Sequence, residues 1–300
     1  MGFFPRTTFI IPLHVSGIWI PHYVENHVEA GSTGVGLNLS VFLKAYFLGG
    51  ECSITLNGEK VLGEQARKVC ELSGVNVATY AQAPLPLGHG FGISAALLIS
   101  HSLAAHIVLG KPLLRALQVA HALEVEYRTG LGDVIAEYLG GIVVRLKPGA
   151  PGVGVAYRVL PRERVDLVVI NLGVPESTST MLSRMTKEDY ELGRALMKKI
   201  VESEDIRVLF ECSRVFTSKL FNYQRAEATI KGLPGVIDYY MKKSALVLWV
   251  EREYLQEVLD NLRKRGIKAF DATISSIGVT LVYPPQSPQE NKLTYTRETS

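Results

Sequence analysis

Cysteine is scarce in this chain of 300 residues, and the three that occur, Cys52, Cys70 and Cys212, are widely spaced. No two of them form a CxxC pair, which is the spacing typical of zinc sites and redox motifs. The spacing therefore argues against a zinc site and against a disulfide framework. It favours a reducing compartment, the cytoplasm.

Charge of one sign and long apolar runs are also missing. The net charge is only +3 at pH 7 and is dispersed, which argues against nucleic acid or a membrane surface as a partner. The most apolar stretch, residues 93–109, contains three serines and two histidines, so a transmembrane helix is not expected. The opening MGFFPRTTFIIPLHV has two prolines and no small-residue cleavage pattern, which predicts a first strand rather than a signal peptide.

The remaining composition, 47% hydrophobic and 20% charged, is that of a globular protein with a real core. Up to residue 175 the pattern predicts strands interspersed with helices. The strands are expected at 7–15, 35–47, 51–58, 75–83, 140–149, 154–160 and 165–173, and the helices at 59–74, 94–109 and 112–128. After residue 180 it predicts helices at 187–203 and 206–222, then a strand (244–250), a helix (251–266) and two strands (267–275 and 276–283). That order is typical of a small α+β sandwich.

One segment, residues 86–96, reads PLGHGFGISAA and places three alternating glycines directly before an apolar helix. Glycines let a ligand approach the backbone closely, and the start of a helix offers free N–H groups to a phosphate. Ser94 at the helix start either caps the helix or ligates a magnesium ion. The alternative is a plain glycine-rich turn, since neither GxxxxGK[ST] nor GxGxxG is present.

Two carboxylates follow. On a helix over residues 112–128, Glu124 falls within the apolar stripe of Leu117 and Ala120, whereas Glu126 points away from it. A buried carboxylate needs a metal or a paired charge, so Glu124 is either a metal ligand or the partner of an arginine such as Arg145.

The second carboxylate, Asp133, comes after two glycines in the string TGLGDV at residues 129–134. A tight turn of this kind holds an acid at the edge of a cleft, although an aspartate that caps the next helical turn is the alternative. A serine and a glutamate that hold magnesium, with an aspartate that receives a hydroxyl proton, are a set suited to phosphoryl transfer.

At this point the sequence resembles the GHMP kinases, whose second motif is a proline followed by GLGSSAA. Residues 90–96 read GFGISAA, with Ile93 in place of the first serine. Within that superfamily the chain is most similar to the archaeal pantoate kinases, from residue 8 to about 283. The matching segments are IPLHVSG (11–17), AGSTGVG (30–36), PLGHGFGIS (86–94), AHALEV (120–125) and TGLGDV (129–134), with Gly140, Gly141 and Arg145 beyond them.

The resemblance implies an α+β fold with two domains. Residues 1–175 would form the N-terminal ATP-binding domain with the glycine-rich phosphate loop, and residues 176–284 a C-terminal ferredoxin-like α/β sandwich. The active site would lie in the cleft between them. Residues 285–300 are polar and broken by prolines, so a disordered tail is expected.

The resemblance also implies residue roles. Ser94 and Glu124 would hold Mg²⁺, and Asp133 would be the catalytic acid/base. ATP would contact Pro86, Gly88, His89, Gly90, Phe91, Gly92, Ile93 and Ser94. The pantoate site would include Ser32, His121, Arg145 and Thr178. For His121, a histidine of the core is an equal alternative. For Thr178, the repeated STST at 177–180 allows the match to shift by two positions.

The implied reaction is the phosphorylation of pantoate by ATP to 4-phosphopantoate, a step toward coenzyme A. Two alternatives stay open: a kinase of this fold for homoserine, shikimate or a mevalonate derivative, and a non-catalytic binding protein on the same scaffold. A metal hydrolase built on His121 and Glu124 is weaker, because a third ligand is missing. The sequence leaves the oligomeric state open, a homodimer included.

Overall fold

The computed structural model describes residues 7–203 and 205–283, so the predicted tail at 285–300 lies outside the described residues. An eight-stranded sheet forms the larger part, with two long antiparallel strands, β1 (Thr8–His22) and β2 (Gly31–Gly49), at its centre. Its order is β12-β1-β2-β5-β3-β4, and β6 pairs with β2 and carries β7. These further strands are β3 (Ser53–Leu56), β4 (Glu59–Val61), β5 (Val77–Gln82), β6 (Ile142–Lys147), β7 (Val155–Val159) and β12 (Thr280–Val282).

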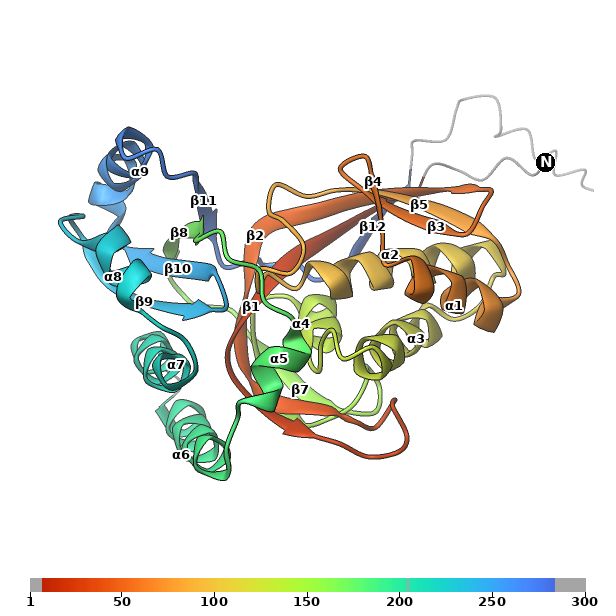
Figure 1. Ribbon diagram of the computed structural model, residues 1–300, viewed down its shortest axis with the longest axis horizontal. Helices are drawn as coiled ribbons and strands as arrows, with labels where there is room; N and C mark the ends of the chain where they lie inside the picture. Colours follow the sequence, from red (N-terminus) through yellow and green to blue (C-terminus); the bar gives the residue numbers. More distant parts are fainter. Residues whose placement is uncertain (1–6, 204, 284–300) are drawn as a thin grey trace, which may run out of the picture.

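The smaller sheet has four antiparallel strands in the order β11-β8-β10-β9. They are β8 (Asp166–Asn171), β9 (Val236–Lys242), β10 (Ala245–Val250) and β11 (Ala269–Thr273). The helices α8 (Gln224–Ile230) and α9 (Leu255–Lys264), the latter after a 3₁₀ turn at Arg252–Tyr254, lie at the outer end of this part (Figure 1).

Helices cover both faces of β1, and its residues 11–20 are therefore buried at consecutive positions. The helices α1 (Gly63–Ser73), α2 (Ile93–Val108), α3 (Leu113–Glu126) and α4 (Asp133–Leu139) lie on one side (Figure 1). On the other side lie α6 (Lys187–Ser203) and α7 (Ile206–Leu220), reached through the short α5 (Thr178–Ser183).

The two sheets share one hydrophobic core, because α7 packs between β1 and β9. Phe216 of α7 meets Trp19 of β1 edge-on, with ring centroids 5.1 Å apart, and Phe210 meets Tyr240 of β9 at 5.4 Å. The Tyr240 hydroxyl donates to the Val15 carbonyl over 2.8 Å. The smaller sheet is thereby fixed directly to the centre of the larger one.

The structure confirms most predicted elements and corrects several others. Residues 59–61 form β4 rather than helix, because Asn57 and Gly58 both have positive φ and close a hairpin with β3. The predicted strand at 276–283 forms β12 in the larger sheet, beside β1, not in the sandwich. β9 was not predicted, and neither were α5 and α8. The two-domain division at residue 175 stays a prediction. β8 precedes that residue, yet it belongs to the smaller sheet.

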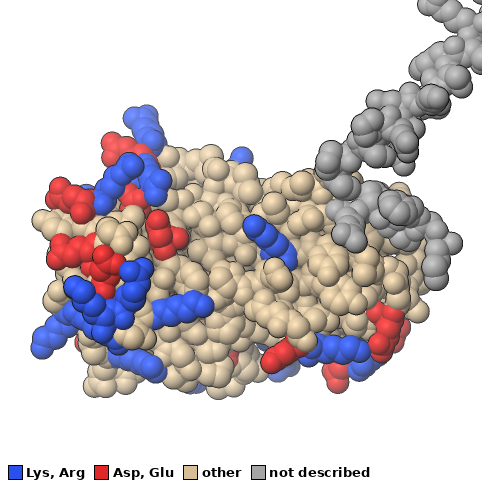
Figure 2. Space-filling model, turned by 90° about the horizontal axis from the view of Figure 1, so that it is seen from above, with Lys and Arg blue, Asp and Glu red and all other residues tan. Residues whose placement is uncertain are grey.

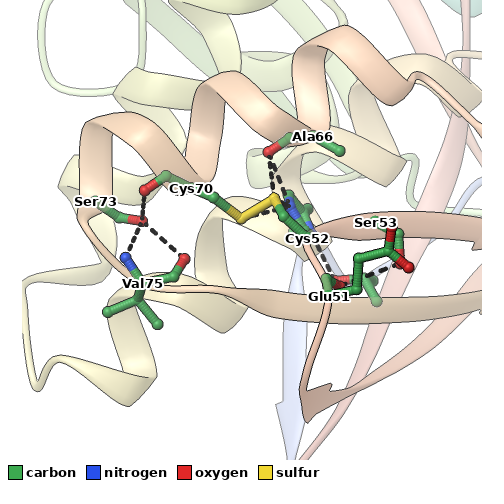
Figure 3. Close-up of a disulfide and its surroundings, with 9 residues drawn as sticks. Glu51, Cys52, Ser53, Ala66, Cys70, Ser73 and Val75 are labelled. Atoms are coloured by element: carbon green, nitrogen blue, oxygen red, sulfur yellow. Dashed lines mark hydrogen bonds between the residues drawn. A yellow bond between two sulfur atoms is a disulfide. The ribbon is translucent and has the colours of Figure 1, made fainter.

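A disulfide joins Cys52 to Cys70, so the expectation that these cysteines are unpaired is wrong. The two residues are 18 apart in sequence, and packing of α1 on β3 brings their Cα atoms to 6.4 Å (Figure 3). Cysteine spacing carried no such signal, because tertiary packing sets this pairing. The bond also removes both thiolates from the Cys52, Cys70 and His101 cluster, which would otherwise offer three metal ligands.

Charged side chains of both signs gather over the end of the molecule that carries α9, and they are sparse over the middle of the face in Figure 2. This face therefore shows no broad patch of one sign. No described helix has the length and apolarity needed to cross a bilayer.

We expect reduction of the disulfide to lower the free energy of unfolding by about 3 kcal/mol, because the loop it closes regains entropy in the unfolded chain. For a chain of this size, that loss lowers Tm by about 5 °C. Calorimetry of the protein with and without a phosphine reductant measures the shift. The Cys52→Ser/Cys70→Ser double variant should melt like the reduced protein and ignore the reductant. A reductant effect of equal size in that variant would contradict this account.

Candidate active site

The glycine loop directly precedes α2, as the sequence predicts, and the helix begins at Ile93, one residue earlier than expected. Its N-cap is Gly92 (φ 75°), and no side chain caps it. A side chain at Gly92 would collide with the Glu137 carboxylate, and one at Gly90 (φ 98°) with the Lys242 carbonyl. Both glycines are therefore required by close neighbours as well as by positive φ.

Ser94 does not cap the helix, because its hydroxyl donates to Glu124 Oε2 over 3.2 Å. Glu124 also accepts a 2.6 Å hydrogen bond from Thr129, and it does not pair with Arg145. Burial raises the pKa of Glu124 to about 7, against the opposing effect of these hydrogen bonds. The pair presents a hydroxyl and a carboxyl group to one point, which are hard oxygen ligands for a divalent cation.

Asp133 is the first residue of α4, but its side chain does not cap that helix. His14 Nδ1–H donates to Asp133 Oδ1 over 2.6 Å, and Lys242 Nζ lies 3.5 Å from the same oxygen. Burial alone would raise the pKa of Asp133, but Lys242 and His14 outweigh it and hold that pKa well below its usual range. Burial lowers the pKa of His14 to about 4, so at neutral pH the imidazole is neutral and Asp133 is ionised.

Two adjoining pockets meet at Asp133. We call the first the glycine-loop cleft; it is lined by Leu62, Leu87, Gly88, residues 90–94, 127–129 and 176–179, Asp133, Lys242 and Lys243. The second, the inner pocket, is lined by Ser16, Trp19, Ser32, residues 130–133, Thr178, Met181, Leu182 and Lys242. Asp133, Thr178 and Lys242 line both, so a group in one pocket can reach a group in the other beside these three side chains.

Arg145 of β6 lies behind the inner pocket. A side chain at Gly132 would meet both the Arg145 guanidinium and the Ser32 hydroxyl, which places these two groups next to each other. Arg145 is 1% exposed, and none of its three guanidinium nitrogens has a hydrogen-bond partner among the described residues. Burial lowers its pKa to about 10, so the group stays charged at neutral pH. An unpaired buried charge is costly, and an anionic ligand would remove that cost.

The other predicted substrate residues differ in their surroundings. Thr178 donates to the Thr129 carbonyl over 2.7 Å and lines both pockets. His121 donates through Nε2 to the Ala30 carbonyl over 2.8 Å and does not line the inner pocket. Among the predicted ATP contacts, Pro86 is exposed. The His89 ring turns to Ser244, whose hydroxyl lies 2.9 Å from Nδ1.

Four groups near the site were not predicted: His14, Glu137, Lys242 and Lys243. Glu137 is one turn after Asp133 on α4, and neither of its carboxyl oxygens has a partner in the described part of the chain. Burial and the nearby Asp133 and Glu124 raise its pKa well above the usual range. The one available signal was the pair of lysines in the short turn between two apolar segments at 236–250.

Comparisons with known proteins show which family this chain belongs to. A family model described as the GHMP kinases N terminal domain matches residues 60–141, which hold the glycine loop, Glu124 and Asp133. Pantoate kinase of Thermococcus kodakarensis is 33% identical over 225 residues, 70% of this chain and 74% of that protein. The chain belongs to the pantoate kinase family of GHMP kinases. Pantoate kinase of Methanocaldococcus jannaschii is also 33% identical, over 147 residues, 47% of this chain and 53% of that protein.

Solved structures share this fold. A protein described as a phosphotransferase related to the CoA biosynthesis pathway superposes with a TM-score of 0.77 at 26% identity, covering 92% of this kinase and 98% of that chain. Mevalonate kinase of Methanococcus jannaschii superposes with a TM-score of 0.66 at 12% identity, covering 90% of this kinase and 99% of that chain, which shows the shared fold. This chain is thus a small-molecule kinase that uses ATP, with the α+β GHMP fold that the sequence predicts.

We predict that Gly90→Ala destabilises this kinase more than Gly88→Ala. Both glycines have positive φ, at 98° and 87°, so both variants carry a backbone cost of about 1 kcal/mol. Only Gly90 also meets the Lys242 carbonyl, whereas the nearest atom to a Gly88 side chain is 3.9 Å away. Urea unfolding of the two variants measures the difference. Equal losses of unfolding free energy in the two variants would show that the contact of Gly90 with the Lys242 carbonyl is not tight.

Proposed function

We propose that this kinase transfers the γ-phosphoryl group of ATP to the primary hydroxyl of pantoate, giving ADP and 4-phosphopantoate, a precursor of coenzyme A. The observation that carries the proposal is the buried, unpaired guanidinium of Arg145 beside Ser32. Its planar fork fits a carboxylate, and pantoate supplies one. The names of the similar proteins, pantoate kinase and a phosphotransferase related to the CoA biosynthesis pathway, support the same substrate.

The lining of the inner pocket also favours pantoate over homoserine. Trp19, Leu131 and Met181 are apolar, and they suit the two methyl groups on the carbon next to the reacting hydroxymethyl group of pantoate. Homoserine would bring an ammonium group toward Arg145 and Lys242, which are both positively charged. Like charges in a buried site repel strongly, so the pocket disfavours amino acids.

Under this proposal the glycine-loop cleft holds the nucleotide, with the free N–H groups at the start of α2 directed at its phosphates. Ser94 and Glu124 would hold Mg²⁺, because their oxygens lie 3.2 Å apart; Ser94 lines this cleft, and Glu124 is buried behind it. When bound there, the ion would neutralise charge on the phosphates. Pantoate would enter at the inner pocket, whose volume of about 20 Å³ must widen to admit it, with its carboxylate directed at Ser32 and at Arg145 behind it, and its hydroxymethyl group at Asp133.

Asp133 takes up the proton. The hydroxyl oxygen attacks the γ-phosphorus, the new O–P bond forms, and the bond from phosphorus to the β–γ bridging oxygen breaks. The hydroxyl proton passes to Asp133 Oδ2, because Oδ1 is occupied by His14 and Lys242. The low pKa of Asp133 makes this transfer late, when the new bond has already made the hydroxyl acidic.

The panel that tests the proposal contains pantoate, homoserine, mevalonate, shikimate and pantothenate, each assayed with magnesium and ATP by coupled ADP release. We expect turnover on pantoate to exceed that on every other alcohol by at least about 100-fold in kcat/KM, since homoserine brings a like charge into the site and the other alcohols hold their carboxylate at a different distance from the reacting hydroxyl. Faster turnover of another alcohol would keep the mechanism and replace the substrate. Binding of ATP with no turnover of any alcohol would favour the non-catalytic scaffold.

Replacing Arg145 separates a substrate clamp from a structural ion pair. Arg145→Met should raise KM for pantoate about 100-fold, because a bidentate charged contact is lost, with a smaller effect on KM for ATP. It should leave Tm unchanged or raise it, because the variant removes an unpaired buried charge. Arg194→Met, on the exposed surface of α6, is the control. A fall in Tm with an unchanged KM would instead assign Arg145 to the fold.

A further inference from the structure

The turn between β9 and β10 reaches from the smaller sheet onto the glycine loop. β9 ends at Lys242, Lys243 adopts a left-handed conformation (φ 56°), and β10 starts at Ala245. Figure 1 shows this turn directed toward the larger sheet. Its Lys242 carbonyl abuts Gly90, and Ser244 Oγ lies 2.9 Å from His89 Nδ1. The turn is therefore fixed against the loop that faces the nucleotide.

Lys242 carries a buried ammonium group to the junction of the two pockets. The residue is 7% exposed, and its Nζ lies 3.3 Å from Ser16 Oγ and 3.5 Å from Asp133 Oδ1. It also lies 5.7 Å from the centre of the Trp19 ring. Lys243 points elsewhere: its Nζ donates to Thr178 Oγ1 over 2.9 Å, and of the two pockets it lines the cleft alone.

We propose that Lys242 is a catalytic residue whose ammonium group contacts the phosphoryl group as it passes from the cleft to the inner pocket. This inference rests on the proposed kinase reaction at the same site. Lys242 lines both pockets, so Nζ can stay in contact with the equatorial oxygens while the phosphorus changes partners. It keeps its protons throughout; the proton of the substrate hydroxyl goes to Asp133.

The alternatives for this role are less well placed. His14 contacts the same carboxylate, but its imidazole is buried and neutral and its Nδ1–H is committed to Asp133. Arg145 lies behind Gly132, outside the residues that line the cleft. Lys243 is one residue away, yet it does not line the inner pocket. Among the described residues, Lys242 is the one cation that lines both pockets.

A cation that acts mainly on charge developing in transfer affects kcat more than substrate binding. We therefore expect Lys242→Met to lower kcat with pantoate about 300-fold, within the range for loss of one such group, and KM for pantoate to change by less than about fivefold. Lys242→Arg should recover part of kcat, since it keeps the charge. Lys268→Met, an exposed lysine of the same half of the molecule, should match the wild type.

A second readout needs no phosphoryl acceptor. With magnesium present, calorimetry measures the affinities of each protein for ATP and for ADP. Lys242→Met should lower the ratio of ATP to ADP affinity about tenfold, because only ATP has the γ-phosphate that Nζ contacts, and it should leave ADP affinity within about twofold.

These outcomes decide between the readings. If Lys242→Met keeps both kcat and the affinity ratio of the wild type, the inference is wrong. If it loses affinity for ATP and ADP equally and also melts at lower temperature, Lys242 merely holds the turn in place, and the inference is wrong again. If the wild type phosphorylates none of the alcohols, the proposed function fails, while the affinity ratio still decides on Lys242.

Discussion

The carboxylate of Asp133 is the point on which the rest of the site depends, because three separate parts of the chain converge on it. His14 comes from the central strand β1, Asp133 from the start of α4, and Lys242 from the end of β9 in the smaller sheet. A buried carboxylate needs such partners to remain ionised. The contact with Lys242 also joins the smaller sheet to the larger part of the molecule. The ionised state of Asp133 and the packing of the two sheets therefore depend on the same contacts.

The surrounding polar groups show what this arrangement costs. Arg145 is buried and charged without a partner, and Glu137 is buried with both oxygens unpaired among the described residues. Groups of this kind destabilise a fold, and they concentrate where ligands bind. The extensive core shared by the two sheets, with Phe216 against Trp19 and Phe210 against Tyr240, offsets that loss. The unpaired buried groups are what the proposed anion site would need if it is preorganised.

Local patterns in the sequence predicted one half of the site. Four features lie close together along the chain: the alternating glycines, Ser94, the carboxylate of Glu124 on an apolar helix face, and the TGLGD turn. Helical periodicity and turn chemistry could therefore find them. The other half depends on contacts between distant segments: Lys242 is 109 residues from Asp133, and β12 pairs with β1 from the far end of the described chain. No local pattern encodes such pairings, and the Cys52–Cys70 bond was missed for the same reason.

The pairing of β1 with β12 also bears on how the protein is made. β1 pairs with β2 along one edge, and its other edge pairs with β12 at residues 8–10. Because synthesis proceeds from the N-terminus, that second edge stays unpaired until residues 280–282 have left the ribosome. β8 likewise waits for both β10 and β11. An unpaired strand edge invites association with other chains. The larger sheet is thus completed only after the strands of the smaller sheet, which come earlier in the chain than β12, have been made.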